Sequence, residues 1–83
     1  MRSHKQTPAT IPDEYRFINL YDVEYYIMWE QLGIGHSFFL KTTATAQEVK
    51  KKLKAYEDYL NMKLATAQRC EFGCYGVRVW RMA

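Results

Sequence analysis

The side chains that could do chemistry in this 83-residue chain are few, and they do not form a recognisable catalytic set. His36 is the single histidine after residue 12, and its neighbours suggest no serine or cysteine nucleophile paired with it. Glu24, Glu30, Glu57 and Asp58 fall on faces expected to contact water, so we expect no pair of carboxylates across a pocket. The sequence therefore predicts a protein that is not an enzyme.

Two cysteines, Cys70 and Cys74, lie close together in the sequence. A structural zinc ion normally takes four thiolate or imidazole ligands, and only His4 and His36 could add to this pair, so we expect no metal and no cofactor. The short spacing would allow a disulfide between the two cysteines across the turn. Free thiols are the default in a reducing cytosol.

Basic side chains gather in the second half of the chain. Residues 41–83 carry nine basic and four acidic side chains, for a net charge of +5, whereas residues 1–40 carry −2. Such a basic half can contact phosphates, and Arg78 and Trp80 share one face of the last strand, where a guanidinium and an indole can meet a base. The predicted nucleic-acid contacts are Lys50, Lys51, Lys54, Arg69, Arg78, Trp80 and Arg81.

Aromatic residues support a second interpretation, a surface for a protein partner. The chain has seven tyrosines, four phenylalanines and two tryptophans, and tyrosine, tryptophan and arginine dominate interface hot spots. The candidate interface residues are Tyr26, Phe39, Tyr75 and Trp80. A homodimer that buries the same face against a second copy fits this composition equally well.

One long helix is the element around which the rest must be organised. Thr45 and Glu48 form a capping-box pattern, which predicts that the helix begins there. Apolar residues then recur at helical spacing up to Leu64, so the helix is predicted to run from about Thr45 to Leu64 with one face on a sheet. The apolar positions of this face are Val49, Leu53, Tyr56, Leu60 and Leu64.

Alternating apolar and polar residues predict the strands that this helix covers. Residues 1–12 are polar with two prolines and are expected to form a flexible arm, and 13–83 one domain. Residues 13–20 suggest a short strand or an irregular packing segment. The remaining strands are expected at 23–28, 36–41, 66–72 and 77–82, the last two joined by a turn at Gly73 to Gly76.

These elements predict an α+β domain with a small, three- to four-stranded, mainly antiparallel sheet in the order β-β-α-β-β. One helix covers only one face of such a sheet. Tyr26, Phe39 and Trp80 are expected on the face away from the helix, since neighbours along a strand point to opposite sides. Either the segment with Tyr15 and Phe17 covers that second face, or the face binds a ligand or a second copy.

The chain resembles a group of small bacteriophage and prophage proteins. The resemblance rests on Tyr26-Ile27-Met28-Trp29, Leu32 and Gly35-His36-Ser37-Phe38-Phe39, followed by a charged helix and the ending Gly76-Val77-Arg78-Val79-Trp80-Arg81. It covers about residues 25–82 and departs in the longer N-terminal extension and in the turn from Cys70 to Cys74. It implies a viral origin and carries over no activity.

Together these observations predict a non-catalytic accessory protein of phage type that binds nucleic acid through its basic C-terminal half. The alternative is a phage-encoded inhibitor that binds a bacterial protein machine, such as a polymerase or a CRISPR or restriction complex, through the aromatic sheet face. No apolar run is long enough to cross a membrane and no leader peptide is evident, so we expect the protein in the cytoplasm of the bacterial host and away from membranes.

Overall fold

The computed structural model describes residues 11–83 of the chain, and its elements follow the order β-β-β-α-β-β. This confirms the α+β class with antiparallel strands and one helix, with one strand more than the predicted order. Ten of the residues expected to form the N-terminal arm lie outside the described range. The elements are η1 (Asp13–Tyr15), β1 (Phe17–Leu20), β2 (Val23–Tyr26), η2 (Trp29–Gln31), β3 (Ser37–Lys41), α1 (Ala46–Leu60), β4 (Leu64–Glu71) and β5 (Cys74–Arg81).

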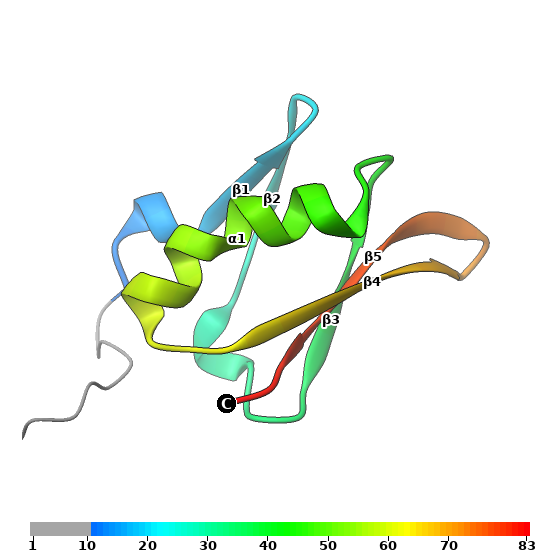
Figure 1. Ribbon diagram of the computed structural model, residues 1–83. Helices are drawn as coiled ribbons and strands as arrows, with labels where there is room; N and C mark the ends of the chain where they lie inside the picture. Colours follow the sequence, from blue (N-terminus) through cyan, green and yellow to red (C-terminus); the bar gives the residue numbers. More distant parts are fainter. Residues whose placement is uncertain (1–10) are drawn as a thin grey trace, which may run out of the picture.

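The strands form two separate sheets. β3, β5 and β4 make an antiparallel sheet with β5 in the middle, and β1 pairs with β2 alone. The sequence predicted that residues 23–28 would join the larger sheet, but β2 ends at Tyr26 and pairs only with β1. α1 passes in front of the β1–β2 hairpin in Figure 1, and its contacts with the larger sheet are mainly with β4.

The β1–β2 hairpin resolves the segment that sequence patterns left undecided. Tyr21 and Asp22 both have positive φ angles, 50° and 66°, which is the backbone of a tight two-residue hairpin turn. This turn sets Leu20 opposite Val23 and Phe17 opposite Tyr26. Residues 13–20 are therefore a short 3₁₀ turn followed by a strand.

The helix begins as predicted and ends earlier. Glu48 donates its backbone N–H to the Thr45 hydroxyl at 3.1 Å, and the Glu48 carboxylate accepts the Thr45 N–H at 2.8 Å, which completes the capping box. The helix ends at Leu60 because Asn61 takes the left-handed conformation, φ 56°, of a helix C-cap. Leu64, predicted as the last helical position, is instead the first residue of β4.

The core lies between α1 and the two sheets. Val49, Leu53 and Leu60 of the helix are fully buried, as are Val77 and Val79 of β5. Burying aliphatic side chains of this size stabilises the fold by about 1.5–3 kcal/mol each. Further buried residues reach the core from the N-terminal side and from η2, including Ile11, Ile18, Leu20, Ile27, Trp29 and Leu32.

In the N-terminal segment, the Tyr15 ring packs on the helix and not on the second sheet face. The Tyr15 ring is stacked on that of Tyr59 with 4.1 Å between centroids, and it meets Tyr56 edge-on at 5.6 Å. The Tyr56 hydroxyl donates to the Phe17 carbonyl at 2.6 Å. Tyr15 therefore does not cover the second face, whereas the Phe17 ring meets that of Tyr26 edge-on with 5.2 Å between centroids.

The β4–β5 hairpin turns at a strained and exposed phenylalanine. Phe72 and Gly73 have φ angles of 55° and 73°, and the Phe72 side chain is 89% exposed. A bulky residue at positive φ is an outlier, whereas Asn-Gly is the favoured pair for this turn. The turn predicted at Gly73 to Gly76 is shifted accordingly, and Gly76 lies inside β5.

Replacing Phe72 with asparagine is expected to raise the free energy of unfolding by about 1 kcal/mol, because the new residue tolerates the left-handed backbone. Urea denaturation of Phe72→Asn beside Phe72→Ala checks this. The alanine variant also removes the ring but keeps the backbone strain. Equal stability of the two variants would contradict the explanation.

Candidate binding surface

The face of the larger sheet opposite α1 carries aromatic and basic side chains. Cross-strand pairs show this, because residues opposite each other in an antiparallel sheet point the same way. Phe39 lies opposite Arg78, Ser37 lies opposite Trp80, and Arg69 of β4 lies opposite Gly76. Phe38, Leu40, Val77 and Val79 point to the helix, as the alternation predicted. We call the face of Phe39, Arg69, Arg78 and Trp80 the open face.

Each arginine of the open face lies over an aromatic ring. The Arg69 guanidinium carbon is 5.7 Å from the centre of the Trp80 ring, and that of Arg78 is 5.8 Å from the centre of the Phe39 ring. Such cation–π contacts stabilise exposed pairs by about 0.5–1 kcal/mol. The four side chains thus form two pairs, each with a flat ring and a guanidinium.

Glu71 neutralises half of the positive charge that Arg69 and Arg78 give the open face. Arg78 donates two hydrogen bonds to its carboxylate, at 2.8 and 2.5 Å, and a third to the Ser37 hydroxyl at 2.7 Å. Arg69 lies 3.7 Å from the same carboxylate. The hydrogen bonds from Arg78 hold the pKa of Glu71 below its ordinary value, and Glu71 raises the pKa of Arg78. Glu71 therefore stays ionised at pH values where an ordinary glutamate takes up a proton.

A groove runs beside the open face, between β2 and β3. Its volume is about 580 Å³, within the range of roughly 300–1,000 Å³ typical of ligand sites. Tyr26 and Met28, which are 53% and 44% exposed, form one side, and Phe39 and Ser37 form the other. The remaining lining residues are Glu24, Tyr25, Ile27, Gln31, Leu32, Phe38 and Leu40.

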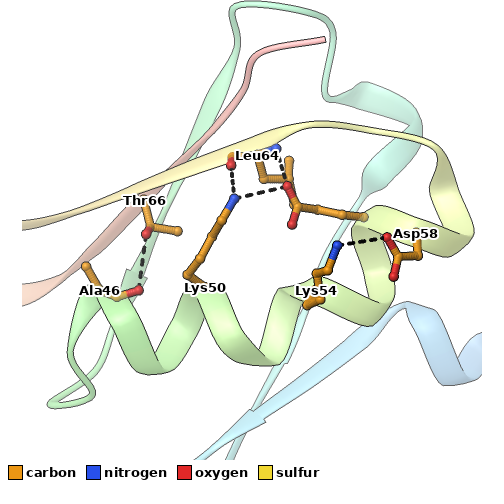
Figure 2. Close-up of polar contacts among 7 residues, drawn as sticks. Ala46, Lys50, Lys54, Asp58, Leu64 and Thr66 are labelled. Carbon is orange, nitrogen blue, oxygen red and sulfur yellow. Dashed lines mark hydrogen bonds and ion pairs between the residues drawn. The ribbon is translucent and has the colours of Figure 1, made fainter.

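Two of the lysines predicted to contact nucleic acid have partners within the fold. Lys50 donates to the Leu64 carbonyl and forms an ion pair with Glu57 at 3.1 Å, while the Leu64 N–H donates to Glu57 at 2.7 Å (Figure 2). Lys54 forms an ion pair with Asp58 at 3.3 Å. Lys50 thereby holds α1 to the edge of β4.

The other predicted contacts divide between two sides of the molecule. Lys51 is exposed on α1, in the layer across the sheet from Arg69, Arg78 and Trp80. Arg81 donates to the Leu32 carbonyl at 3.0 Å and to the Ala83 carbonyl at 3.2 Å, so it ties the end of β5 to η2. The seven predicted nucleic-acid contacts therefore do not form one patch.

The residues predicted for a protein interface lie closer together. Tyr26 and Phe39 line the same groove, and Trp80 lies opposite Ser37 of its wall. Tyr75 is apart from them, 63% exposed near the tip of the β4–β5 hairpin and on the other face of the sheet. We call Tyr26, Met28, Phe39 and Trp80 the aromatic surface.

Sequence reasoning missed Glu71 and Met28. Glu71 could have been found from the hairpin register, because a turn at Phe72 and Gly73 sets Glu71 opposite Cys74 and on the face of Arg78. This register was not predicted because the turn at Phe72 and Gly73 lacks the asparagine that usually precedes glycine in a two-residue hairpin turn. Met28 follows Tyr26 by two positions and lines the same groove, although it lies between β2 and η2 and not in a strand.

Cys70 and Cys74 are both free thiols and do not bond to each other. Cys70 lies opposite Tyr75, and Cys74 lies opposite Glu71. Successive positions alternate between the sheet faces, so the two sulfurs point to opposite sides of the hairpin. Within residues 11–83 no three His, Cys, Asp or Glu side chains are grouped closely enough to hold a metal ion.

In the described part of the chain no helix has the length and apolar character needed to cross a membrane. Comparison with known proteins gives no matching family model, no matching curated protein and no matching solved structure.

Proposed function

We propose that this chain is a non-catalytic binding protein and that it holds another protein at the aromatic surface. The observation that carries the proposal is the grouping of Tyr26, Met28 and Phe39 around one groove, with Trp80 beside it. Exposed apolar side chains around a groove mark a partner site, and tyrosine and tryptophan are the usual anchors.

The charges of the fold support a protein partner over nucleic acid. Lys50, Arg78 and Arg81 already bond to groups of the chain itself, so a phosphate would have to compete with those partners. Affinity for nucleic acid comes mainly from basic side chains that replace counterions on phosphates. With the resemblance to phage proteins, the proposed partner is a protein of a bacterial machine, met in the host cytoplasm.

The test is capture of partner proteins from bacterial lysate by the immobilised chain and its variants. Tyr26→Ser is expected to lower capture of a specific partner about tenfold or more, because loss of a hot-spot aromatic costs about 2 kcal/mol. Tyr75→Ser is the matched control, since Tyr75 is an equally exposed strand tyrosine outside the groove. Unchanged capture by Tyr26→Ser would refute the proposal.

Nucleic acid stays a second candidate because of the two arginine–aromatic pairs. A single strand could stack bases on Trp80 and Phe39 next to Arg69. In that case a labelled single-stranded oligonucleotide should bind in a salt-dependent manner, and Arg69→Gln should weaken it. Lys51→Gln serves as the control because Lys51 lies on the helix side.

A further inference from the structure

The edge of β3 that borders the groove directs main-chain groups outward. Arg81 donates its N–H to the His36 carbonyl at 2.9 Å, so this pair bonds across β3 and β5. In an antiparallel ladder bonded pairs alternate with unbonded ones, which makes Phe38–Val79 and Leu40–Val77 the next bonded pairs. The amides and carbonyls of Ser37 and Phe39 therefore point away from β5 and toward the groove.

The edge of β2 presents the same pattern from the opposite wall. The tight turn makes Leu20–Val23 a bonded pair, and Ile27 donates to the Arg16 carbonyl at 2.7 Å. The alternation leaves the main-chain groups of Glu24 and Tyr26 directed away from β1. Both residues line the groove.

One end of the β3 edge is closed by a side chain. The Tyr25 hydroxyl donates to the Lys41 carbonyl, which belongs to the next outward-directed residue after Phe39. Among residues 11–83, no hydrogen-bond partner is seen for the outward main-chain groups of Ser37 and Phe39, so this stretch of β3 offers two amides and two carbonyls. This stretch matches a short extended peptide and not a rounded small molecule, because a peptide backbone offers the complementary groups at the same spacing.

From these edges we propose that the groove binds an extended segment of the partner protein, which pairs with β3 as an added strand. Its side chains alternate between the apolar floor near Phe38 and Leu40 and the outer rim near Tyr26. Glu24 is the one charged residue among the groove lining, so the segment carries a lysine or arginine at the end that faces it. Proline is excluded from the positions that pair with Ser37 and Phe39.

This inference rests on the proposed function, and a defined peptide tests it separately. The probe is the capped peptide Lys-Val-Thr-Val-Thr-Val, titrated into the isotope-labelled protein while backbone amide shifts are followed by NMR. We expect saturable shifts at Ser37 and Phe39 with a dissociation constant of about 1 mM, the weak range for a short generic strand. No saturable shift at these amides would overturn the inference.

N-methylated probes show whether main-chain bonds hold the peptide. One form carries N-methyl groups on the backbone nitrogens of its valines, and the other on those of its threonines. A strand that pairs along one edge uses the backbone N–H groups of only one of these two sets of residues. One form should therefore bind about tenfold more weakly than the parent while the other binds like it. Equal binding of all three would overturn pairing with β3, whereas loss of binding in both methylated forms would show that the peptide also pairs with the β2 edge.

A protein variant separates this mode from the proposed function. Ser37→Pro removes the outward N–H and the hydroxyl that meets Arg78, whereas Ser37→Ala removes only the hydroxyl. Peptide shifts at Phe39 should disappear in the proline variant and persist in the alanine variant, while both variants keep the dispersed amide signals of a folded β5. Equal binding by the two variants would overturn strand addition, while the proposed function fails only if Tyr26→Ser keeps its lysate partner.

A second copy of the chain is the competing occupant. If copies pair through this edge, the Ser37 and Phe39 amides will shift when the protein alone is concentrated. That result would overturn the assignment of the groove to a partner segment.

Discussion

Gly76→Ala is expected to detach β3 from β5 and to destabilise the domain by about 3 kcal/mol or more. A Cβ atom at this position would lie 2.2 Å from the Leu40 carbonyl oxygen and 2.6 Å from the Phe39 ring. The first of these is backbone, so the strands themselves must move apart. For a chain of this length the total stability is about 4–12 kcal/mol, so the loss is a large share of it.

Urea denaturation measures this effect, and Gly33→Ala is the matched control. A Cβ at Gly33 would meet only the His36 side chain, at 3.4 Å, which a small rotation relieves. The control should therefore stay within about 1 kcal/mol of the parent chain. A Gly76→Ala protein as stable as the parent would show that β3 does not approach β5 as closely as described.

Trp29→Ala is expected to cost about 3–5 kcal/mol of unfolding free energy. Trp29 is 1% exposed, and its indole N–H donates to the Tyr15 carbonyl at 2.6 Å. Its ring also meets Phe38 edge-on at 6.0 Å and lies 6.1 Å from that of Tyr56. The substitution thus leaves a cavity between the hairpin, the sheet and the helix, together with a carbonyl that has lost its donor.

Thermal unfolding is the measurement for Trp29. For a domain of this size each kcal/mol shifts Tm by about 4–8 °C, so the alanine variant should melt at least about 12 °C lower. Met28→Ala is the control, because Met28 is the adjacent residue but is 44% exposed. A similar loss in both variants would mean that Trp29 does not anchor the core.

Local sequence patterns were enough to predict the helix start and the two faces of the larger sheet. The Thr45–Glu48 capping box depends only on residues three positions apart. Alternation along β3 and β5 placed Phe39 and Trp80 away from the helix for the same reason, since neighbouring strand residues always point to opposite sides. Interactions between residues this close together in the sequence can be predicted from the sequence alone.

Such local patterns did not predict the positions of the turns or the ion pairs. Tyr21, Asp22 and Phe72 adopt positive φ angles although none is glycine or asparagine. The β1–β2 turn was therefore not predicted, and the β4–β5 turn was predicted to begin one residue too late, at Gly73. Gly76 was predicted to turn the chain, but it lies inside β5, where the Phe39 ring and the Leu40 carbonyl leave no room for a Cβ atom.

The basic residues predicted to contact nucleic acid are not grouped as expected, because their partners are brought close only by folding. Counting charges shows that the second half is basic, but it does not show which lysines and arginines are already bonded. The partners of Lys50 and Arg78 are Glu57 and Glu71, each seven positions away and brought close only by the folded helix, strand and hairpin. Charge counted along the chain therefore overstated what is available to phosphates.

The contact of Lys50 and Glu57 with Leu64 protects the start of the β4 edge against an added strand. These side chains occupy the donor and acceptor at the start of the β4 edge, so an added strand would first have to displace them. A sheet with two usable edges can grow into a fibre, whereas a sheet with one accepts a single strand and stops. Within the described residues this protection reaches only the first residue of β4, so a strand that adds to this edge must begin beyond Leu64.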